Sequence, residues 1–174
     1  MKRVVVLGAA GSGKSTLARL LGAQTGLPVH NLDQVFWMPD WTPRPEAEKL
    51  EMVAEIEAQA QWIIEGGVSA TFENRIARAD TLVWLDLPVT LRLWRIMVRT
   101  LAHRGRSRPD MPEGCVQRFD RNTLSFLRFI WQDRHAGHQR MAACRSLAGE
   151  GGVVVHHLTS RRAVRAFQRA VTQE

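Results

Sequence analysis

Apolar runs and amphipathic stretches alternate along the whole chain. Five short runs rich in Val, Ile and Leu have the length of buried strands. They occupy residues 2–8, 29–32, 62–65, 81–87 and 153–158. Between them, apolar residues recur at the three- and four-residue spacing of helices. The predicted helices cover residues 14–25, 46–60, 69–79, 90–103, 118–147 and the stretch from 160 onward. This alternation predicts an α/β fold in which helices cover both faces of a parallel sheet with right-handed connections.

Two stretches depart from the alternation. Residues 36–45 combine Phe, Trp and Pro without the spacing of a helix or strand, so we expect an aromatic loop there. Residues 104–117 have the sequence RGRSRPDMPEGCVQ, with alternating arginines, two prolines and two glycines but few apolar anchors. This composition predicts a mobile loop that could close over a ligand.

The glycine-rich stretch GAAGSGKST lies directly behind the first predicted strand and opens the first predicted helix. It fits the phosphate-binding pattern G-x-x-x-x-G-K-[ST] in full. In such a loop, backbone N–H groups surround a phosphate chain at the positive end of a helix. Lys14 is expected on the β- and γ-phosphates, Ser15 on Mg²⁺ and Thr16 near the α-phosphate. The predicted nucleotide-binding residues are Gly8, Gly11, Ser12, Gly13, Lys14, Ser15 and Thr16.

The charge is unevenly distributed over a chain whose formal net charge is +7. The second half holds most of the arginines and no lysine, which is consistent with an anionic ligand because Arg binds phosphate in a bidentate manner. Cys115 and Cys144 are far apart, and His135, His138, His156 and His157 lack partners at ligand spacing, so we expect these histidines to be solvated or structural. We therefore expect reduced thiols and no zinc site. No apolar run approaches the length of a membrane span, and we expect a cytoplasmic protein.

Carboxylates stand where predicted strands end, at Asp33, Glu65 and Asp86. Ligands of open α/β sheets bind outside the carboxyl ends of the strands, which is also where the glycine-rich loop lies. One of Asp33 and Glu65 could deprotonate an acceptor hydroxyl, and the other could hold the water shell of Mg²⁺. Helix capping or loop hydrogen bonding is the alternative for each. We do not expect Asp86 to be a metal ligand.

Arginines also cluster before and within the stretch 104–117. At 100° per residue, Arg92, Arg95 and Arg99 share one helix face, opposite a stripe formed by five apolar residues. A solvated charged face accounts for these three. The arginines of the following loop, Arg104, Arg106 and Arg108, are predicted to neutralise charge on a transferred phosphoryl group.

These stretches together resemble the adenylate-kinase-like nucleoside monophosphate kinases, and most closely the DNA topology modulation (FlaR-related) proteins. The resemblance rests on GAAGSGKSTLAR, LPVHNLDQVFW, WIIEGG, ARADTLVWLDLP, RGRSRPDMPEGC and HLTSRRAVRAF, and covers nearly the whole chain. It implies a single domain over residues 1–174 with a five-stranded sheet of order 2-3-1-4-5. It also implies an acceptor-binding region at about 33–60 and an arginine-bearing lid at about 104–117. Lys14 and the three lid arginines would lie at the phosphates, and Asp33 on the acceptor side.

The chain departs from that family pattern after the third strand. Relatives have D-G-N-Y or D-G-F-P-R there, whereas this chain has Glu65-Gly66-Gly67-Val68 with no arginine nearby. The arginine expected to bind the phosphate of a nucleoside monophosphate acceptor is therefore missing. The lid also lacks four cysteines for a zinc ion.

The sequence thus predicts an ATP- and Mg²⁺-dependent phosphotransferase with an unidentified small-molecule acceptor, in a monomer or homodimer. The alternative is a nucleic-acid-associated P-loop protein that affects DNA topology, which the basic second half allows but a missing helicase-type acidic pair disfavours. A GTPase is disfavoured because the chain has no N-K-x-D motif.

Overall fold

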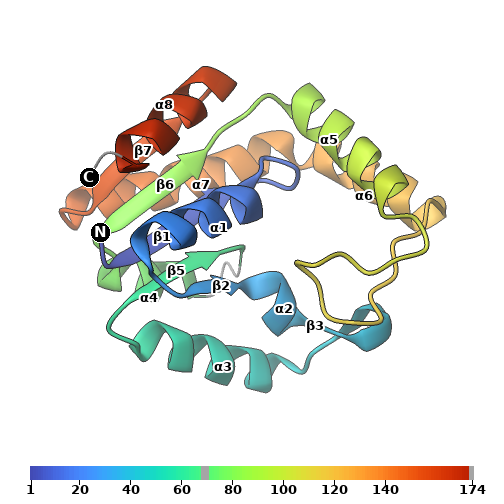
Figure 1. Ribbon diagram of the computed structural model, residues 1–174, viewed down its shortest axis with the longest axis horizontal. Helices are drawn as coiled ribbons and strands as arrows, with labels where there is room; N and C mark the ends of the chain where they lie inside the picture. Colours follow the sequence, from blue (N-terminus) through green and yellow to red (C-terminus); the bar gives the residue numbers. More distant parts are fainter. Residues whose placement is uncertain (68–70, 173–174) are drawn as a thin grey trace.

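Five parallel strands form the centre of the computed structural model, which describes residues 1–67 and 71–172. The strand order is β2-β5-β1-β6-β7, so the predicted order 2-3-1-4-5 is confirmed (Figure 1). The strands are β1 (Arg3–Gly8), β2 (Val29–Asn31), β5 (Trp62–Glu65), β6 (Thr81–Leu85) and β7 (Val154–Leu158). Among the described residues, no helix is long and apolar enough to cross a membrane.

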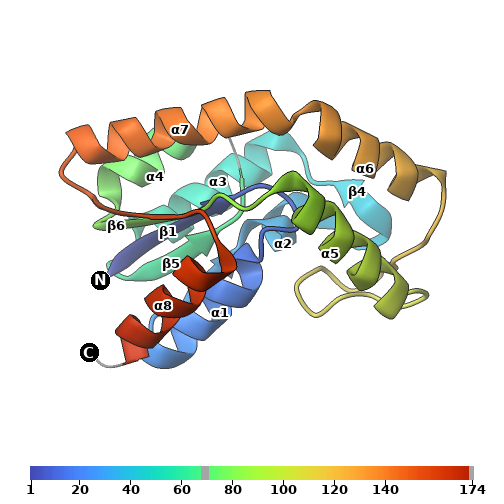
Figure 2. The ribbon, with the colours of Figure 1, turned by 90° about the horizontal axis from the view of Figure 1, so that it is seen from above.

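Helices cover both faces of the sheet. Successive residues of a strand point to opposite faces, and here the residues on both faces are apolar. Val4 and Val6 of β1 pack toward α1 and α8, while Val5 and Leu7 pack toward the helices of the opposite face (Figure 2). The helices are α1 (Lys14–Thr25), α2 (Leu32–Phe36), α3 (Glu46–Ala58), α4 (Phe72–Arg78), α5 (Val89–Ala102), α6 (Arg121–Gln132), α7 (Arg134–Glu150) and α8 (Arg161–Thr172). The predicted helix cap at Ser69 lies outside the described residues.

The predicted aromatic loop after β2 is instead ordered into short elements. Helix α2 is followed by β3 (Trp37–Met38), the 3-10 turn η1 (Pro39–Trp41) and β4 (Thr42–Pro43), with β3 and β4 paired antiparallel. The side chain of Asn31 begins α2 by accepting the N–H of Asp33 at 2.9 Å. Arg44 then donates its Nε to the carbonyl of Val35 at 2.8 Å. Such hydrogen bonds leave no periodic pattern of apolar residues in the sequence, so the hydrophobic pattern did not predict these elements.

The predicted long helix over 118–147 is divided into α6 and α7 at Asp133. Its N–H bonds the carbonyl of Phe129, which ends α6, and its carbonyl accepts the N–H of Gly137 in α7. Asp120 caps the start of α6 by accepting the N–H of Thr123 at 3.1 Å. The two helices therefore diverge, and α6 extends beyond the carboxyl ends of the strands beside α5 (Figure 2).

The lid, residues 104–117, is anchored, contrary to the expectation of few anchors. Met111 and Cys115 are buried, and isolated bridges join Arg104 to Gln117 and Ser107 to Val116. The lid reaches across to η1, where the indole N–H of Trp41 donates to the carbonyl of Val116 at 3.1 Å. The contacts of Val116 with Trp41 and of Cys115 with Met38 join the lid to residues distant in sequence, which local composition does not reveal.

A buried arginine joins α4 to α3 and to the segment after β5. Arg75 is fully buried, and its Nε lies 3.2 Å from Oε1 of Glu57. Its other nitrogens bond the carbonyl of Gly66 at 3.3 Å and the hydroxyl of Thr71 at 2.6 Å. Burial lowers the pKa of Arg75, and the charge of Glu57 opposes that shift. Arg75, the first arginine after β5, is therefore held in the protein core by these contacts.

We predict that Arg75→Met lowers the free energy of unfolding by about 3–5 kcal/mol, because Glu57 is left buried without a counter-charge. Urea denaturation measures the change. The double variant Arg75→Met/Glu57→Leu should recover most of the loss, and Arg78→Met, at an exposed position of the same helix, should change stability by less than about 0.5 kcal/mol. A small loss in the single variant would contradict the assignment.

Candidate active site

The phosphate-binding loop connects β1 to α1 and leaves the start of that helix without a side-chain cap. Gly13 stands at the N-cap position with a left-handed backbone of φ 99°, and the first turn of α1 holds no acidic residue. The hydroxyl oxygen of Ser12 is buried without a protein partner. The first N–H groups of α1 are therefore available to an anion, as the sequence pattern predicted.

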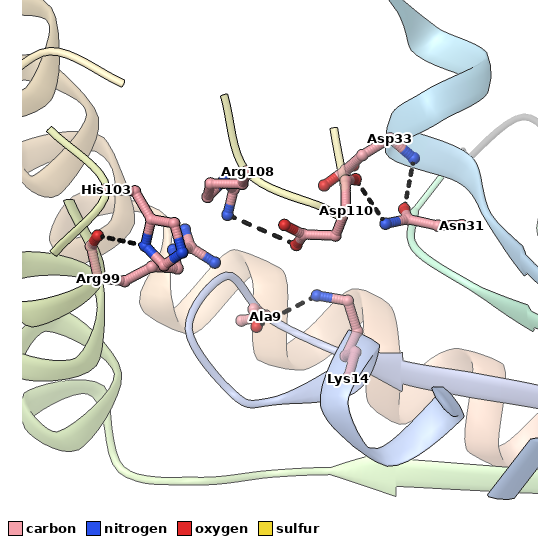
Figure 3. Close-up of polar contacts among 8 residues, drawn as sticks. All are labelled: Ala9, Lys14, Asn31, Asp33, Arg99, His103, Arg108 and Asp110. Atoms are coloured by element: carbon pink, nitrogen blue, oxygen red, sulfur yellow. Dashed lines mark hydrogen bonds and ion pairs between the residues drawn. The ribbon is translucent and has the colours of Figure 1, made fainter. Parts of the chain in front are cut away.

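Lys14, Ser15 and Glu65 lie together behind this loop. The Nζ of Lys14 is 3.5 Å from the carbonyl of Ala9 (Figure 3), and Glu65 is buried with its Oε1 unpartnered. Burial raises the pKa of Glu65, while the charge of Lys14 and a hydrogen bond from Ser15 lower it. A hydroxyl next to a carboxylate is an oxygen set suited to Mg²⁺. No group of three or more His, Cys, Asp or Glu at metal-binding distance occurs within residues 1–67 and 71–172. An ion here would therefore also need phosphate oxygens.

Helix α5 lies against the outer side of the loop. A Cβ atom at Gly11, where φ is 77°, would stand 2.5 Å from the carbonyl oxygen of Arg92 and 3.0 Å from the side chain of Ile96. Nη1 of Arg95 donates to the carbonyl of Ser12 at 2.9 Å. The loop is therefore held from outside by α5, and glycine is required where the two backbones approach.

The orientation of α5 is opposite to that expected from its amphipathic pattern. The side facing the protein contains Arg92 and Ile96, which are 7% and 1% exposed. The apolar stripe faces outward, with Trp94 63% and Leu101 54% exposed. The prediction that the arginines form a solvated face is therefore wrong for Arg92. Arginine is directed inward here because a cavity, and not an apolar core, lies beneath the helix.

That cavity, about 1690 Å³ in volume, extends from the glycine-rich loop to α2, α6 and the lid. Three arginines on its wall have a buried Nε without a protein partner, namely Arg92, Arg99 and Arg108. Burial lowers the pKa of Arg99, as does the charge of Arg108 nearby, while Asp110 and Asp33 oppose the shift. Neighbouring guanidinium groups whose Nε atoms have no partner among the described residues are well suited to bind a polyanion.

The three predicted lid arginines are placed differently. Arg108 is buried, lines the cavity and pairs with Asp110 at 3.6 Å (Figure 3). Arg104 and Arg106 are exposed and do not line the cavity. The positions that the loop pattern did not single out, Arg92 and Arg99, lie on the cavity wall instead. The sequence feature that could have identified Arg92 and Arg99 is their i, i+7 spacing, which places them on the same face of the helix.

The wall opposite the loop is formed by α2 and η1. Asp33 is exposed in the first turn of α2 and lines the cavity together with Trp37, Asp40 and Trp41. The side-chain amide of Asn31 connects this wall to the lid, because it accepts the N–H of Asp33 and donates to the carbonyl of Asp110 at 2.9 Å (Figure 3). Asp33 therefore belongs to a capped helical turn and still faces the cavity.

A second cavity of about 450 Å³ lies on the other side of the glycine-rich loop. It is lined by Gly13 and Leu87 and, from α8, by Arg161 and Val164, with Arg95 reaching it from α5. The glycine-rich loop thus has space on both sides. This space has apolar and cationic groups but no carboxylate among its described lining residues.

Asp86, at the end of β6, is bound by histidines. His138 and His157 both place Nε2 at its Oδ2, at 3.1 and 3.0 Å, and the His157 ring stacks on Trp84 with centroids 4.2 Å apart. This carboxylate therefore joins α7 to β7. Asp86 and its two histidines thus form a polar contact between these elements.

A parallel sheet of this order, with the glycine-rich loop after its central strand and a lid after β6, is the fold of the P-loop kinases. Over its full length the chain resembles shikimate kinase of Acinetobacter baumannii in complex with shikimate (TM-score 0.60, 17% identity, 99% of this chain and 92% of the other). It also resembles shikimate kinase of Bacteroides thetaiotaomicron (TM-score 0.58, 18% identity, 99% and 97%). A gluconokinase of Sinorhizobium meliloti has a TM-score of 0.53 at 15% identity, with 99% and 90% covered.

In sequence, the chain is 29% identical over 107 residues to the uncharacterized protein YqaC of Bacillus subtilis. The alignment spans 60% of each chain. No protein-family model matches the chain. The comparisons therefore establish the P-loop kinase fold and leave the resemblance to DNA topology modulation proteins a prediction.

We predict that Arg108→Gln lowers the rate of ATP turnover about 10- to 100-fold, since a hydrogen bond to a charged group contributes roughly 1.5–3 kcal/mol. Arg106→Gln, in the same loop but outside the cavity, is the matched control and should stay within about twofold. Steady-state measurement of ADP release compares the two. Equal losses would show that the burial of Arg108 has no bearing on catalysis.

Proposed function

We propose that the protein transfers the γ-phosphoryl group of ATP, with Mg²⁺, to a hydroxyl group of a small-molecule acceptor. The observation that carries this proposal is the uncapped start of α1 at Gly13, which faces a cavity whose opposite wall presents the carboxylate of Asp33. A phosphate donor site and a potential base thus face the same space. The kinase fold of the neighbouring structures supports the proposal.

The triphosphate would lie on the N–H groups of the glycine-rich loop, with Lys14 at the β- and γ-phosphates. Ser15 and the buried Glu65 fit the Mg²⁺ side, because both lie behind the loop and offer oxygen atoms. Bound Mg²⁺ would neutralise charge on the phosphate oxygens. Arg92, Arg99 and Arg108 would bind the remaining oxygens with nitrogens that have no protein partner.

The base of the nucleotide would occupy the second cavity. It adjoins Gly13 and offers the flat guanidinium of Arg95 and the apolar side chains of Leu87 and Val164. A guanidinium plane and an aliphatic surface can hold an aromatic base between them. This places the base and the acceptor on opposite sides of the glycine-rich loop.

The different burial of the two carboxylates supports a division of their roles, which the sequence left open. Glu65 is 2% exposed and lies next to Ser15, whereas Asp33 is exposed on the cavity wall. In the proposed reaction, Asp33 accepts the proton of the acceptor hydroxyl, whose oxygen bonds the γ-phosphorus. The bond from that phosphorus to the β,γ-bridging oxygen breaks, and ADP leaves with the bonding electrons.

The nucleic-acid alternative depends on the basic second half of the chain. Two of its arginines, Arg92 and Arg108, are buried on the cavity wall, whereas many others, such as Arg104 and Arg121, are exposed. The direction of Arg92 and Arg108 favours a small anionic ligand. Binding of DNA that weakens steeply with salt would favour the alternative.

We predict that Lys14→Ala abolishes acceptor-dependent ADP release while the fold stays intact, because Lys14 acts on phosphate charge and not on core packing. Circular dichroism and thermal unfolding check the fold, and Lys2→Ala, at an exposed lysine, is the control. Near-native turnover in Lys14→Ala would show that the loop is not a phosphate site.

Asp33→Asn should lower kcat by about 100-fold or more with little change in the affinity for ATP, because the amide keeps the shape but cannot accept the proton. Glu51→Gln, at an exposed position of α3, should leave both unchanged. Titration with ATP and steady-state kinetics separate the two effects. Equal losses of ATP binding and kcat would point to a structural role for Asp33 in beginning α2.

A further inference from the structure

We propose that the acceptor is a hydroxylated compound without a phosphate or carboxylate group. This proposal rests on the phosphotransfer proposed above. The hydroxyls of the acceptor would be bound by Asp33 and Asp110, and its ring or carbon skeleton would pack against Trp37 and Trp41. The wall that α2 and η1 form, together with Asp110 of the lid, is here called the acceptor wall. It comprises Asp33, Trp37, Asp40, Trp41 and Asp110.

The five residues of the acceptor wall are three aspartates and two tryptophans. The lining residues that the structure describes between positions 31 and 67 are Asp33, Trp37, Asp40, Trp41 and Gly67. A site for an anionic acceptor needs arginine or lysine at this wall, because an anion that leaves water must gain charged hydrogen bonds. Three aspartates would instead repel such an acceptor.

The basic residues closest in sequence to this wall are engaged elsewhere. Arg44 bonds the carbonyl of Val35 and lies 3.4 Å from Glu48. Lys49 pairs with Glu46 at 2.5 Å and lies over the ring of Phe36. Arg75 is fully buried against Glu57. None of these three lines the cavity, so they cannot supply the missing charge without breaking these contacts.

The lid supplies the second carboxylate of the pair. The backbone of Asp110 is fixed by Asn31, whose same side chain fixes the backbone of Asp33, so the two aspartates are positioned by one amide (Figure 3). The carboxylate of Asp110 is 3.6 Å from Nη1 of Arg108, which is beyond hydrogen-bond distance. The carboxylate of Asp110 can therefore still accept hydrogen bonds from the hydroxyl groups of a ligand. Two carboxylates held this way can each bind one hydroxyl of a polyol.

Arg108 is the independent observation that points to a ligand at this place. It is 7% exposed, lines the cavity and has an Nε without a protein partner. It lies beside Asp110 in Figure 3, between that carboxylate and the Arg99 side of the cavity. The described cavity lining between positions 31 and 67 has carboxylates and indoles but no cation, whereas Arg92, Arg99 and Arg108 lie on other parts of the wall. In the proposal, these arginines hold the phosphate side of the cavity and the acceptor wall holds the hydroxyl side.

The indoles are held by an unusual backbone. Asp40 and Trp41 both have left-handed φ angles, 59° and 58°, which a bulky residue rarely adopts. The N–H of the Trp41 ring is bonded to the lid, and its ring lies 5.7 Å from that of Trp37 at 75°. The fixed indole offers its apolar face to a ligand, and such faces pack well against the C–H groups of a polyol ring.

Matched pairs of probe acceptors that differ in one anionic group provide the test. The pairs are glucose with gluconate and uridine with uridine monophosphate, each assayed for ADP release with ATP and Mg²⁺. We expect a neutral member to be phosphorylated with a kcat/KM at least tenfold above that of its anionic partner. Preference for an anionic member, or no turnover with either neutral member, would overturn the proposal.

The variant Asp110→Asn tests the lid carboxylate itself. We expect kcat/KM for the neutral acceptor to fall about tenfold at an unchanged KM for ATP, with Glu113→Gln, an exposed lid residue, as the control. Unchanged kcat/KM in Asp110→Asn would remove Asp110 from the acceptor site. If turnover depends on Lys14 but selects the anionic members, the kinase assignment stands and only the acceptor class fails. If no ATP binds in a Lys14-dependent way, the kinase assignment itself fails.

Discussion

Backbone N–H groups without protein partners at the start of α1 are the constraint on which the rest of the site depends. No side chain caps this helix at Gly13, so its positive end is open to an anion. The neighbouring elements hold the loop without covering it. The carbonyl of Arg92 closes on Gly11 from outside, Arg95 bonds the carbonyl of Ser12, and Glu65 stands behind Lys14. Arg95 and Lys14 bond carbonyl oxygens of the loop, and no side chain caps the start of α1 at Gly13.

The same constraint explains why α5 is oriented with its arginines inward. An amphipathic helix normally buries its apolar stripe, but α5 stands over a cavity and not over the sheet. Burying Arg92 and leaving Trp94 exposed is unfavourable for stability alone. The arrangement becomes favourable when a polyanion occupies the cavity. Local conflicts between pattern and packing of this kind are expected at functional sites.

The sheet order and the glycine-rich loop could be predicted from the sequence because both depend on patterns of neighbouring residues. Runs such as Trp62 to Ile64 are continuous and apolar, and the spacing of Gly8, Gly13 and Lys14 fixes the phosphate loop. The acceptor side could not be predicted in the same way. The bond of Cys115 to Met38 and the bridging amide of Asn31 depend on partners far along the chain, and the burial of Arg75 depends on how α3 and α4 pack. Periodicity also identified the two faces of α5 correctly, but it carries no information on which face meets a cavity.

The docking of the lid on η1 has a consequence for the timing of a catalytic cycle. Cys115 bonds the carbonyl of Met38, and Trp41 bonds that of Val116, so the lid is fastened to the acceptor wall and not to the glycine-rich loop. The second cavity, beside Gly13, is lined by no lid residue that the structure describes. In the proposed kinase, the nucleotide base could then leave the second cavity while the lid stays on η1, although Arg108 would have to release the phosphates. A tighter contact between the lid and η1 would slow the departure of the proposed phosphorylated product before it slowed the chemistry.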